Sequence, residues 1–252
     1  MIWQQRSNDA LPAAPIMLPD PIWQIVFGRG YDSTEKIENL VQPKLKDLAH
    51  PFSLHQMDLA VARLIQAFQN EEKILIYGDY DLDGSPGIVL LREGLIKLGF
   101  SNVEVFQPLR LKDGYGLHSH KIADFKNLGV QLIVTVDVGI TDIESVDIAN
   151  EMGIDVIITD HHLPKEKHPN AFAIVNPNKG NCESNLQHLC GTGVAFYLIL
   201  ALRMEMSQKK LLKQEFNPKE LLDLFAIATI TDMVPLIKEN RVLVKHGLLQ
   251  LC

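Results

Sequence analysis

The chain has 252 residues, of which 46% are hydrophobic and 22% are charged, so it can bury a full core as one large or two small domains. No apolar run approaches the roughly 20 residues needed to span a bilayer, and the opening residues, MIWQQRSNDALPAAP, lack a basic and then apolar signal pattern. The composition therefore argues against a membrane protein or a secreted one and predicts a cytoplasmic globular protein.

Cysteine usage and net charge restrict the partners further. The three cysteines, Cys182, Cys190 and Cys252, are odd in number and lack CxxC spacing, so we expect free thiols and neither a disulfide framework nor a zinc–thiolate site. With 24 basic and 31 acidic residues the formal net charge is −7. That is the wrong sign for a domain that holds nucleic acid mainly by neutralising phosphates.

The N-terminal part differs from the rest of the chain. Residues 1–50 are dotted with prolines and only weakly periodic, which predicts an N-terminal extension of short helices packed on a larger core, with the main domain at 51–252. From Ser53, expected as an N-cap, six apolar residues recur at helical spacing: Leu54, Met57, Val61, Leu64, Ile65 and Phe68. This pattern predicts an amphipathic helix leading into the first strand.

The stretch Lys73–Gly87 predicts a strand, an acidic turn and a helix. The β-branched apolar run 74–77 is typical of a buried strand, and it stops at a glycine followed by three alternating acids, Asp79, Asp81 and Asp83. Ser85 is then expected as the N-cap and Pro86 at the first helical position, ahead of an apolar helical repeat.

Three carboxylates at this density repel one another, and a bound divalent cation would relieve the repulsion. A plainer alternative is an acidic turn in which one aspartate caps the helix and the others face water. A calcium loop is disfavoured by Pro86 and by the lack of a glutamate at the end of the loop. The motif alone leaves the first two interpretations open.

Strand and helix patterns then alternate. The strand-like segments are 103–109, 131–137, 155–160 and 172–176, and helical periodicity occupies 119–127 and 142–152. This alternation predicts an α/β fold, with a parallel β-sheet flanked by helices on both faces.

Acids and histidines stand where these strands end. Asp137 ends one strand, and Asp160 ends the next, with His161 and His162 directly after it. Parallel strands bring their carboxyl ends to one edge of the sheet, so these side chains and the acidic turn should converge. A carboxylate-rich set with imidazole favours manganese or magnesium, although a lone His-His pair is more often part of a surface loop.

The last third of the chain predicts a helical C-terminal part. Gly191 and Gly193 precede the apolar helix VAFYLILALRM, where simple helix packing would explain them. Asn217 and Pro218 open a further apolar helix, which delivers Asp232. A carboxylate at the end of such a helix is expensive to bury without a partner, and a metal would be one.

At this point the residues resemble a known family, the DHH phosphoesterases. Four segments resemble its motifs in the right order: GDYDLDG at 78–84, VDVGI at 136–140, TDHH at 159–162 and ITDMVPL at 230–236. The segments between them resemble the RecJ branch of single-strand-specific exonucleases: RGY near the start, PLRLKDGYGL at 108–117, VNPN at 175–178, CGTGVAFYL at 190–198 and ENRVLVKHGL at 239–248. The resemblance covers most of the chain.

The resemblance implies a reaction and a site. It implies hydrolysis of phosphodiesters by two Mn²⁺ or Mg²⁺ ions, with the catalytic ligands Asp81, Asp83, Asp137, His161, His162 and Asp232, and with Asp79 and Asp160 as further ligands or directly beside them. Two such ions would add about four positive charges to an acidic chain where a phosphate docks. In a RecJ-like enzyme the substrate is the 5′ end of single-stranded DNA in repair and recombination, and a single-strand-binding protein or a helicase is a candidate partner.

Three further residues, Arg110, Lys112 and His118, are expected in the loop after the second strand, where they could contact phosphate or simply be solvated. Two departures from the family pattern could each remove a hydrogen bond behind a ligand: Ser85-Pro86-Gly87 after the first motif and Val138 in the second. RecJ enzymes also continue into further domains, so a fragment is expected.

Three other functions stay open. The first is a DHH phosphoesterase that cleaves short oligonucleotides or cyclic dinucleotides. The second is a non-catalytic nucleic-acid-binding homologue, which loss of a motif acid or histidine would favour; all are present. The third, a pyrophosphatase of the same superfamily, is disfavoured by the RecJ-like segments between the motifs.

Overall fold

The computed structural model describes residues 12–14 and 16–251, which form two compact units, one ending at Leu48 and the other beginning at Ala49. The expected domain bounds, 1–50 and 51–252, stay a prediction. Packing of the N-terminal extension on the core stays a prediction.

Short helices make up the first unit, as the sequence predicted. They are α1 (Asp20–Phe27), α2 (Thr34–Val41) and the 3-10 helix η1 (Leu45–Asp47). Trp23 of α1 is buried and its indole Nε1 donates to the carbonyl of Pro12 at 2.8 Å. Ser33 caps α2 by accepting the N–H of Lys36 at 3.3 Å.

Five parallel strands form the sheet of the second unit. They are β1 (Lys73–Gly78), β2 (Val103–Phe106), β3 (Val130–Val136), β4 (Asp155–Thr159) and β5 (Ala173–Val175), in the spatial order β2-β1-β3-β4-β5. All four strand pairs are parallel, which confirms the expected sheet. The second strand is shorter than expected, because Gln107 turns away to donate to the carbonyl of Asp79 and Pro108 has no N–H to continue the ladder.

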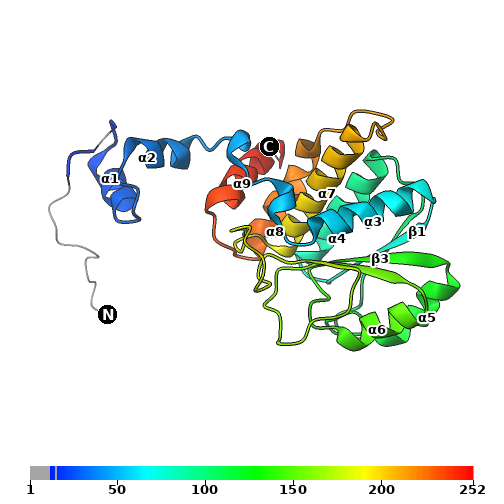
Figure 1. Cartoon of the computed structure of the whole chain (residues 1–252). Helices are drawn as coiled ribbons and strands as arrows, with labels where there is room; N and C mark the ends of the chain where they lie inside the picture. Colours follow the sequence, from blue (N-terminus) through cyan, green and yellow to red (C-terminus); the bar gives the residue numbers. More distant parts are fainter. Residues whose placement is uncertain (1–11, 15, 252) are drawn as a thin grey trace. The chain divides into compact units, whose positions relative to one another are not determined.

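Helices cover both faces of the sheet (Figure 1). One layer contains α3 (Met57–Gln69), α4 (Gly84–Lys97) and α7 (Gly191–Gln208), and the other contains α5 (Ser119–Asn127) and α6 (Ile143–Glu151). The central strands β1, β3 and β4 are mostly apolar because both faces of the sheet are buried there, whereas the edge strand β2 exposes Glu104 and Val105. On the α5 and α6 side, Tyr77, Phe125, Ile133 and Val146 belong to one apolar cluster.

The C-terminal part is helical, as predicted. It comprises the 3-10 helix η3 (Pro218–Leu221), α8 (Leu222–Thr231) and α9 (Lys238–Leu251). Asn217 accepts the N–H of Lys219 at 3.2 Å and so begins η3. Helix α8 packs against α9, α4 and α7. Across the described residues, every helix is too short or too polar to cross a membrane.

The cysteine prediction is confirmed for the two cysteines that the structure describes. Cys182 and Cys190 are buried free thiols, and Cys252 lies outside the described residues.

The prediction that Ser53 is the N-cap of α3 was wrong. Ser53 ends a separate 3-10 helix, η2 (Pro51–Ser53), and α3 starts at Met57 after Gln56, whose backbone is left-handed with φ of 60°. This turn aims the Gln56 side chain at the edge of the sheet, where its Oε1 accepts the N–H of Ile174 at 2.8 Å. A contact between residues so far apart along the chain leaves no local sequence signal.

The predicted cap of α4 was also wrong by two residues. The helix starts at Gly84 with Asp83 at the N-cap position, because the carboxylate of Asp81 accepts the N–H groups of both Asp83 and Gly84, at 2.8 and 2.9 Å. Ser85 lies inside the first turn, where its hydroxyl accepts from Gln107 at 2.6 Å. One acid of the turn therefore caps the helix, as the plainer interpretation expected, but Asp79 and Asp83 are buried and do not face water as it also expected.

Val138 follows the acid Asp137 directly, but it is fully buried in the apolar cluster that also contains Leu117 and Ile140. An asparagine there would bury an amide among apolar side chains. We expect Val138→Asn to lower the free energy of unfolding by about 1–3 kcal/mol and not to raise activity. Thermal unfolding measures the change, with Val138→Ala as the control for lost volume. Faster hydrolysis with an unchanged thermal midpoint would contradict this interpretation.

Candidate metal centre

Three neighbouring strands end in aspartates at one edge of the sheet. Gly78 pairs with Val136 and Val136 with Thr159, so β1, β3 and β4 stop at the same level. The backbone ladder continues one residue further: Asp79 N–H donates to Val136, Asp137 N–H to Thr159 and Asp160 N–H to Val175. The predicted convergence of these acids is therefore built by the strand register.

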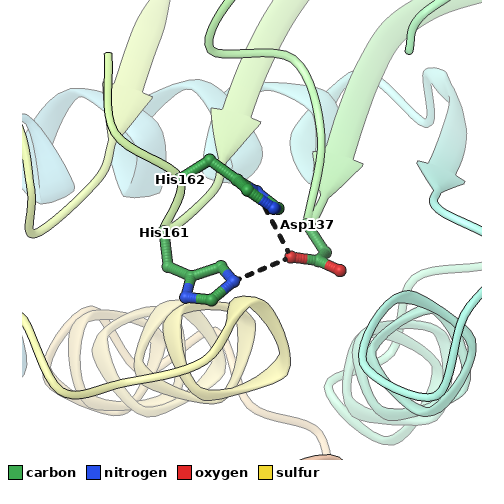
Figure 2. Close-up of side chains that lie close together, drawn as sticks. All are labelled: Asp137, His161 and His162. Atoms are coloured by element: carbon green, nitrogen blue, oxygen red, sulfur yellow. Dashed lines mark ion pairs between the residues drawn. The ribbon is translucent and has the colours of Figure 1, made fainter. Parts of the chain in front are cut away.

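The tandem histidines face the central one of these acids (Figure 2). Asp137 Oδ1 lies 3.2 Å from His161 Nε2 and 3.7 Å from His162 Nδ1. His161 Nε2 also lies 3.7 Å from an oxygen of Asp83 and 3.7 Å from an oxygen of Asp232. Asp232, at the end of α8, therefore lies beside the same histidine as the acids at the strand ends.

The ligand atoms fall into three overlapping groups, each within 4.8 Å: Asp137, His161 and His162; Asp83, His161 and Asp232; and Asp79, Asp81 and Asp137. Asp137 and His161 each belong to two groups. Adjacent groups that share ligand residues can hold a pair of closely spaced cations.

Buried oxygens without partners show that the donor set suits a cation. Within the described residues, Asp79 Oδ1, Asp137 Oδ1 and Asp232 Oδ2 are buried and have no hydrogen-bond partner. Burial raises the pKa of all three carboxyls, and the neighbouring carboxylate of Asp83 raises the pKa of Asp137 and Asp232 further. Divalent cations would satisfy these oxygens and neutralise their charge.

Backbone strain also marks this position. Asp137 is left-handed, with φ of 61°, a conformation that costs free energy for a residue with a side chain. Thr135 donates its hydroxyl to the carbonyl of Val138 at 2.6 Å and holds this turn.

Asp83 is fixed by the start of α7. Its carboxylate accepts the N–H of Gly191 at 2.6 Å and the N–H of Thr192 at 2.8 Å, and the Thr192 hydroxyl donates to its carbonyl at 2.6 Å. A carboxylate at a helix N-terminus satisfies backbone donors and the positive end of the helix dipole. Asp83 therefore caps a helix that begins more than a hundred residues later.

Gly191 also makes room for the central acid. A Cβ at Gly191 would lie 2.5 Å from both Cβ and Oδ1 of Asp137, whereas a Cβ at Gly193 would meet Leu189 and Phe225 at 3.2 to 3.3 Å. Packing thus accounts for Gly193, as sequence reasoning expected, but Gly191 serves the site.

Asp160 supports the histidines from behind. Its Oδ1 accepts the N–H groups of His161 and His162, at 2.7 and 3.0 Å, and lies 2.8 Å from His162 Nδ1, while its Oδ2 accepts the N–H of Ile140 at 3.0 Å. Burial acts to raise the pKa of Asp160, but the hydrogen bonds with His162 outweigh it and the pKa is lowered. The hydrogen bond with Asp160 raises the pKa of His162 in turn. Asp160 stands beside the three ligand groups, not within them.

Two asparagines that the sequence analysis did not assign a role donate hydrogen bonds to the backbone of the histidine turn. Asn176 Nδ2 donates to the carbonyl of His162 at 2.9 Å, and Asn178 Nδ2 donates to the carbonyl of His161. The segment 175–178 therefore fixes the backbone of the turn.

Tyr115 is a residue at the site that sequence reasoning missed. Its hydroxyl donates to the carbonyl of Asp137 at 3.2 Å and lies 3.3 Å from His162 Nδ1. The loop that carries it is anchored directly after Tyr115, since Tyr77 donates to the carbonyl of Gly116 and Leu117 N–H donates to Asp142. An aromatic residue between two glycines in a loop after a strand was the available signal.

The three residues expected to contact phosphate differ in how close they lie to the metal ligands. The Arg110 guanidinium carbon lies 5.5 Å from the ring centre of Tyr80 in the acidic turn. Lys112 is exposed, and His118 Nε2 lies 3.2 Å from the carbonyl of Gly114. Of the three side chains, Arg110 is the one whose described contact reaches a segment with metal ligands, the acidic turn.

Comparison with known proteins agrees with this geometry. The chain is 43% identical over 210 residues to the single-stranded-DNA-specific exonuclease RecJ of Haemophilus influenzae, covering 82% of this chain and 36% of the relative. It is 40% identical over 250 residues to RecJ of Salmonella typhimurium, covering 97% of this chain and 42% of the relative. The chain thus spans less than half the length of these curated relatives.

A solved structure and a family profile point the same way. The structure of RecJ in complex with Mn²⁺ from Thermus thermophilus superposes with a TM-score of 0.71 at 32% identity, covering 89% of this chain and 30% of that one. The profile of the DHH family, N-terminal domain, matches residues 73–229, which hold the first three motifs and most of α8. The chain belongs to the DHH family.

Proposed function

We propose that this chain is the catalytic part of a metal-dependent, RecJ-like exonuclease that degrades single-stranded DNA from its 5′ end. The observation that carries the proposal is the sharing of Asp137 and His161 between adjacent groups of ligand atoms. The curated relatives are named single-stranded-DNA-specific exonucleases, and solved RecJ structures from Thermus thermophilus hold Mn²⁺ or Mg²⁺. We expect the same two metals here.

The residues divide into those that hold the ions and those that hold the ligands. We assign metal binding to seven residues whose oxygen or nitrogen atoms join the three groups: Asp79, Asp81, Asp83, Asp137, His161, His162 and Asp232. Two bound ions would supply an activated water and stabilise the charge that develops on phosphorus. Asp160 orients His162, and the donors of α7 orient Asp83.

Substrate contacts are proposed on the loop between β2 and α5. Tyr115 reaches the centre directly, and Arg110 lies beside the acidic turn, so both are placed to meet the strand next to the scissile phosphate. Lys112 and His118 are proposed to contact phosphates further along. A role in DNA repair and recombination, with a single-strand-binding protein or helicase as partner, is part of the proposal, and the free thiols Cys182 and Cys190 fit a cytoplasmic location.

Replacing one ligand from each end of the site tests the assignment. We expect Asp81→Ala and His161→Ala each to reduce Mn²⁺-dependent hydrolysis by more than about 100-fold, because loss of a ligand should exceed the effect of losing a group behind one. The fold should persist, since neither side chain belongs to the apolar core, although Asp81→Ala also removes the cap of α4, which costs about 1 kcal/mol. Asp124→Ala, on the exposed face of α5, is the matched control.

The assay uses single-stranded DNA labelled at the 5′ or the 3′ end, with duplex DNA and chelator as controls. Nucleotides released from the 5′ end of single strands, in the presence of Mn²⁺, support the proposal. Activity that survives in either ligand variant contradicts the site. Preferential cleavage of dinucleotides would assign a short-substrate phosphoesterase instead, and binding without cleavage would assign a non-catalytic homologue.

A further inference from the structure

A buried histidine–glutamate pair lies outside the three ligand groups. His188, in the segment before α7, places Nε2 at 2.7 Å from Oε2 of Glu239, the second residue of α9, and the two side chains are only 7% and 11% exposed. The other carboxylate oxygen of Glu239 accepts the N–H of Ala49 at 3.4 Å. Such a pair is costly to desolvate, so its position should serve a purpose beyond stability.

The residue after Glu239 reinforces the same connection. Asn240 is fully buried, and its Nδ2 donates both to the carbonyl of His188 and to the carbonyl of Pro235, the latter at 3.0 Å. The start of α9 therefore holds the side chain and the backbone of His188, together with the turn that precedes α9. We refer to His188, Glu239 and Asn240 as the α9 bridge.

Each segment that the α9 bridge connects lies next to one metal ligand along the chain or holds it by hydrogen bonds. On one side, His188 precedes by three and four residues the N–H donors of Gly191 and Thr192, which fix Asp83. On the other side, Pro235 lies three residues after Asp232. Asp83 and Asp232 have no direct hydrogen bond to each other among those described, and both face His161 Nε2 at 3.7 Å. The residues just before them are joined directly, since the Thr231 hydroxyl donates to the carbonyl of Leu82 at 3.0 Å, so the α9 bridge acts beside this contact.

We infer that the α9 bridge sets the separation of Asp83 and Asp232, and so controls the affinity of the cation position that these two acids share with His161. The inference rests on the proposed metal site. The other acidic group, Asp79, Asp81 and Asp137, contains neither of the two acids that the bridge positions. Breaking the bridge should therefore weaken one cation position and spare the other.

A purely structural role would give a different result. Removing one member of a buried ion pair lowers the stability of the whole domain. If that were its only effect, a variant that is still folded would bind both ions as the wild type does. The numbers and affinities of bound ions separate the two roles.

The test is a Mn²⁺ titration of the full chain by calorimetry, with electron paramagnetic resonance to detect coupled pairs of ions. In Glu239→Gln, which keeps the shape and removes the charge, we expect one ion to bind about 10- to 100-fold more weakly and the other to be unchanged. The coupled-pair signal should then be lost at Mn²⁺ concentrations that still fill the stronger position. Glu220→Gln, which breaks the exposed 2.8 Å pair with Lys97, should change neither affinity.

Thermal unfolding verifies that each variant is folded, and Asn240→Ser, which breaks the second connection of the α9 bridge, provides an independent variant. Unchanged binding of both ions in the folded variants overturns the inference and leaves the proposed function standing. Equal weakening of both ions assigns the bridge a general structural role and also overturns it. A wild-type chain that binds no Mn²⁺ would overturn the proposed function and this inference together.

Discussion

Asp137→Asn is expected to abolish metal-dependent hydrolysis and, at the same time, to stabilise the metal-free protein. Asp137 belongs to two of the three ligand groups, so its loss should cost more than about 100-fold in activity. Its buried oxygen has no hydrogen-bond partner, so removing the charge should raise the metal-free free energy of unfolding by about 1 kcal/mol, or about 2–4 °C in thermal midpoint.

The stability gain should depend on pH in a definite direction. Burial and the neighbouring Asp83 raise the pKa of Asp137 above the ordinary carboxyl value of about 3.9. As the pH rises, Asp137 loses its proton at a lower pH in the unfolded chain than in the folded protein. The wild type therefore loses stability between about pH 3.9 and the raised pKa of the folded state. The advantage of the asparagine variant should be larger at about pH 8 than at about pH 5, measured in chelator. Asp124→Asn is the matched control, and an asparagine variant that is less stable at both pH values would contradict this account.

Gly191→Ala is expected to disrupt the same centre without touching a ligand. The added Cβ would lie 2.5 Å from the Cβ and Oδ1 of Asp137, so the helix start or the acid must move. Overpacking of this kind costs about 1–3 kcal/mol of stability. Movement of the helix start also displaces the N–H that Asp83 accepts at 2.6 Å, so we expect Mn²⁺ affinity to fall by at least about 10-fold.

The matched control for this prediction is Gly180→Ala, because a Cβ at Gly180 would enter open space. Calorimetric titration with Mn²⁺ and thermal unfolding measure the two effects. Wild-type affinity in Gly191→Ala would show that the close approach of α7 to Asp137 is not needed for the site.

The layout of the fold was predictable because it depends on local patterns. Buried parallel strands are continuous apolar runs, and each of the central runs here stops at an acid. The period of the pattern distinguishes strand from helix, and the alternation of the two fixes a parallel sheet. Since parallel strands share an edge, the meeting of Asp79, Asp137 and Asp160 followed from sequence alone.

The supporting contacts were not predictable, because each joins residues that are distant in sequence. Gly191 is explained only by the nearness of Asp137, and Gln56 only by the open edge of β5. Tyr115 reaches His162 through a loop whose course no periodicity describes. The packing of Val138 was hidden for a similar reason, since its position in a motif does not say which face of the turn its side chain occupies.

The hydrogen bonds of Asp160 have a consequence for how the protein acquires its metals. The chain's own backbone N–H groups and asparagine side chains shape the histidine turn, so loading need not wait for a folding step, unlike in small zinc domains that assemble around their ion. Metal ions would then bind to and leave a site that is already folded. Oxygen-rich sites discriminate weakly between Mn²⁺ and Mg²⁺, so the bound ion would follow the supply of each ion in the cell, and the rate of the proposed hydrolysis would follow that supply too.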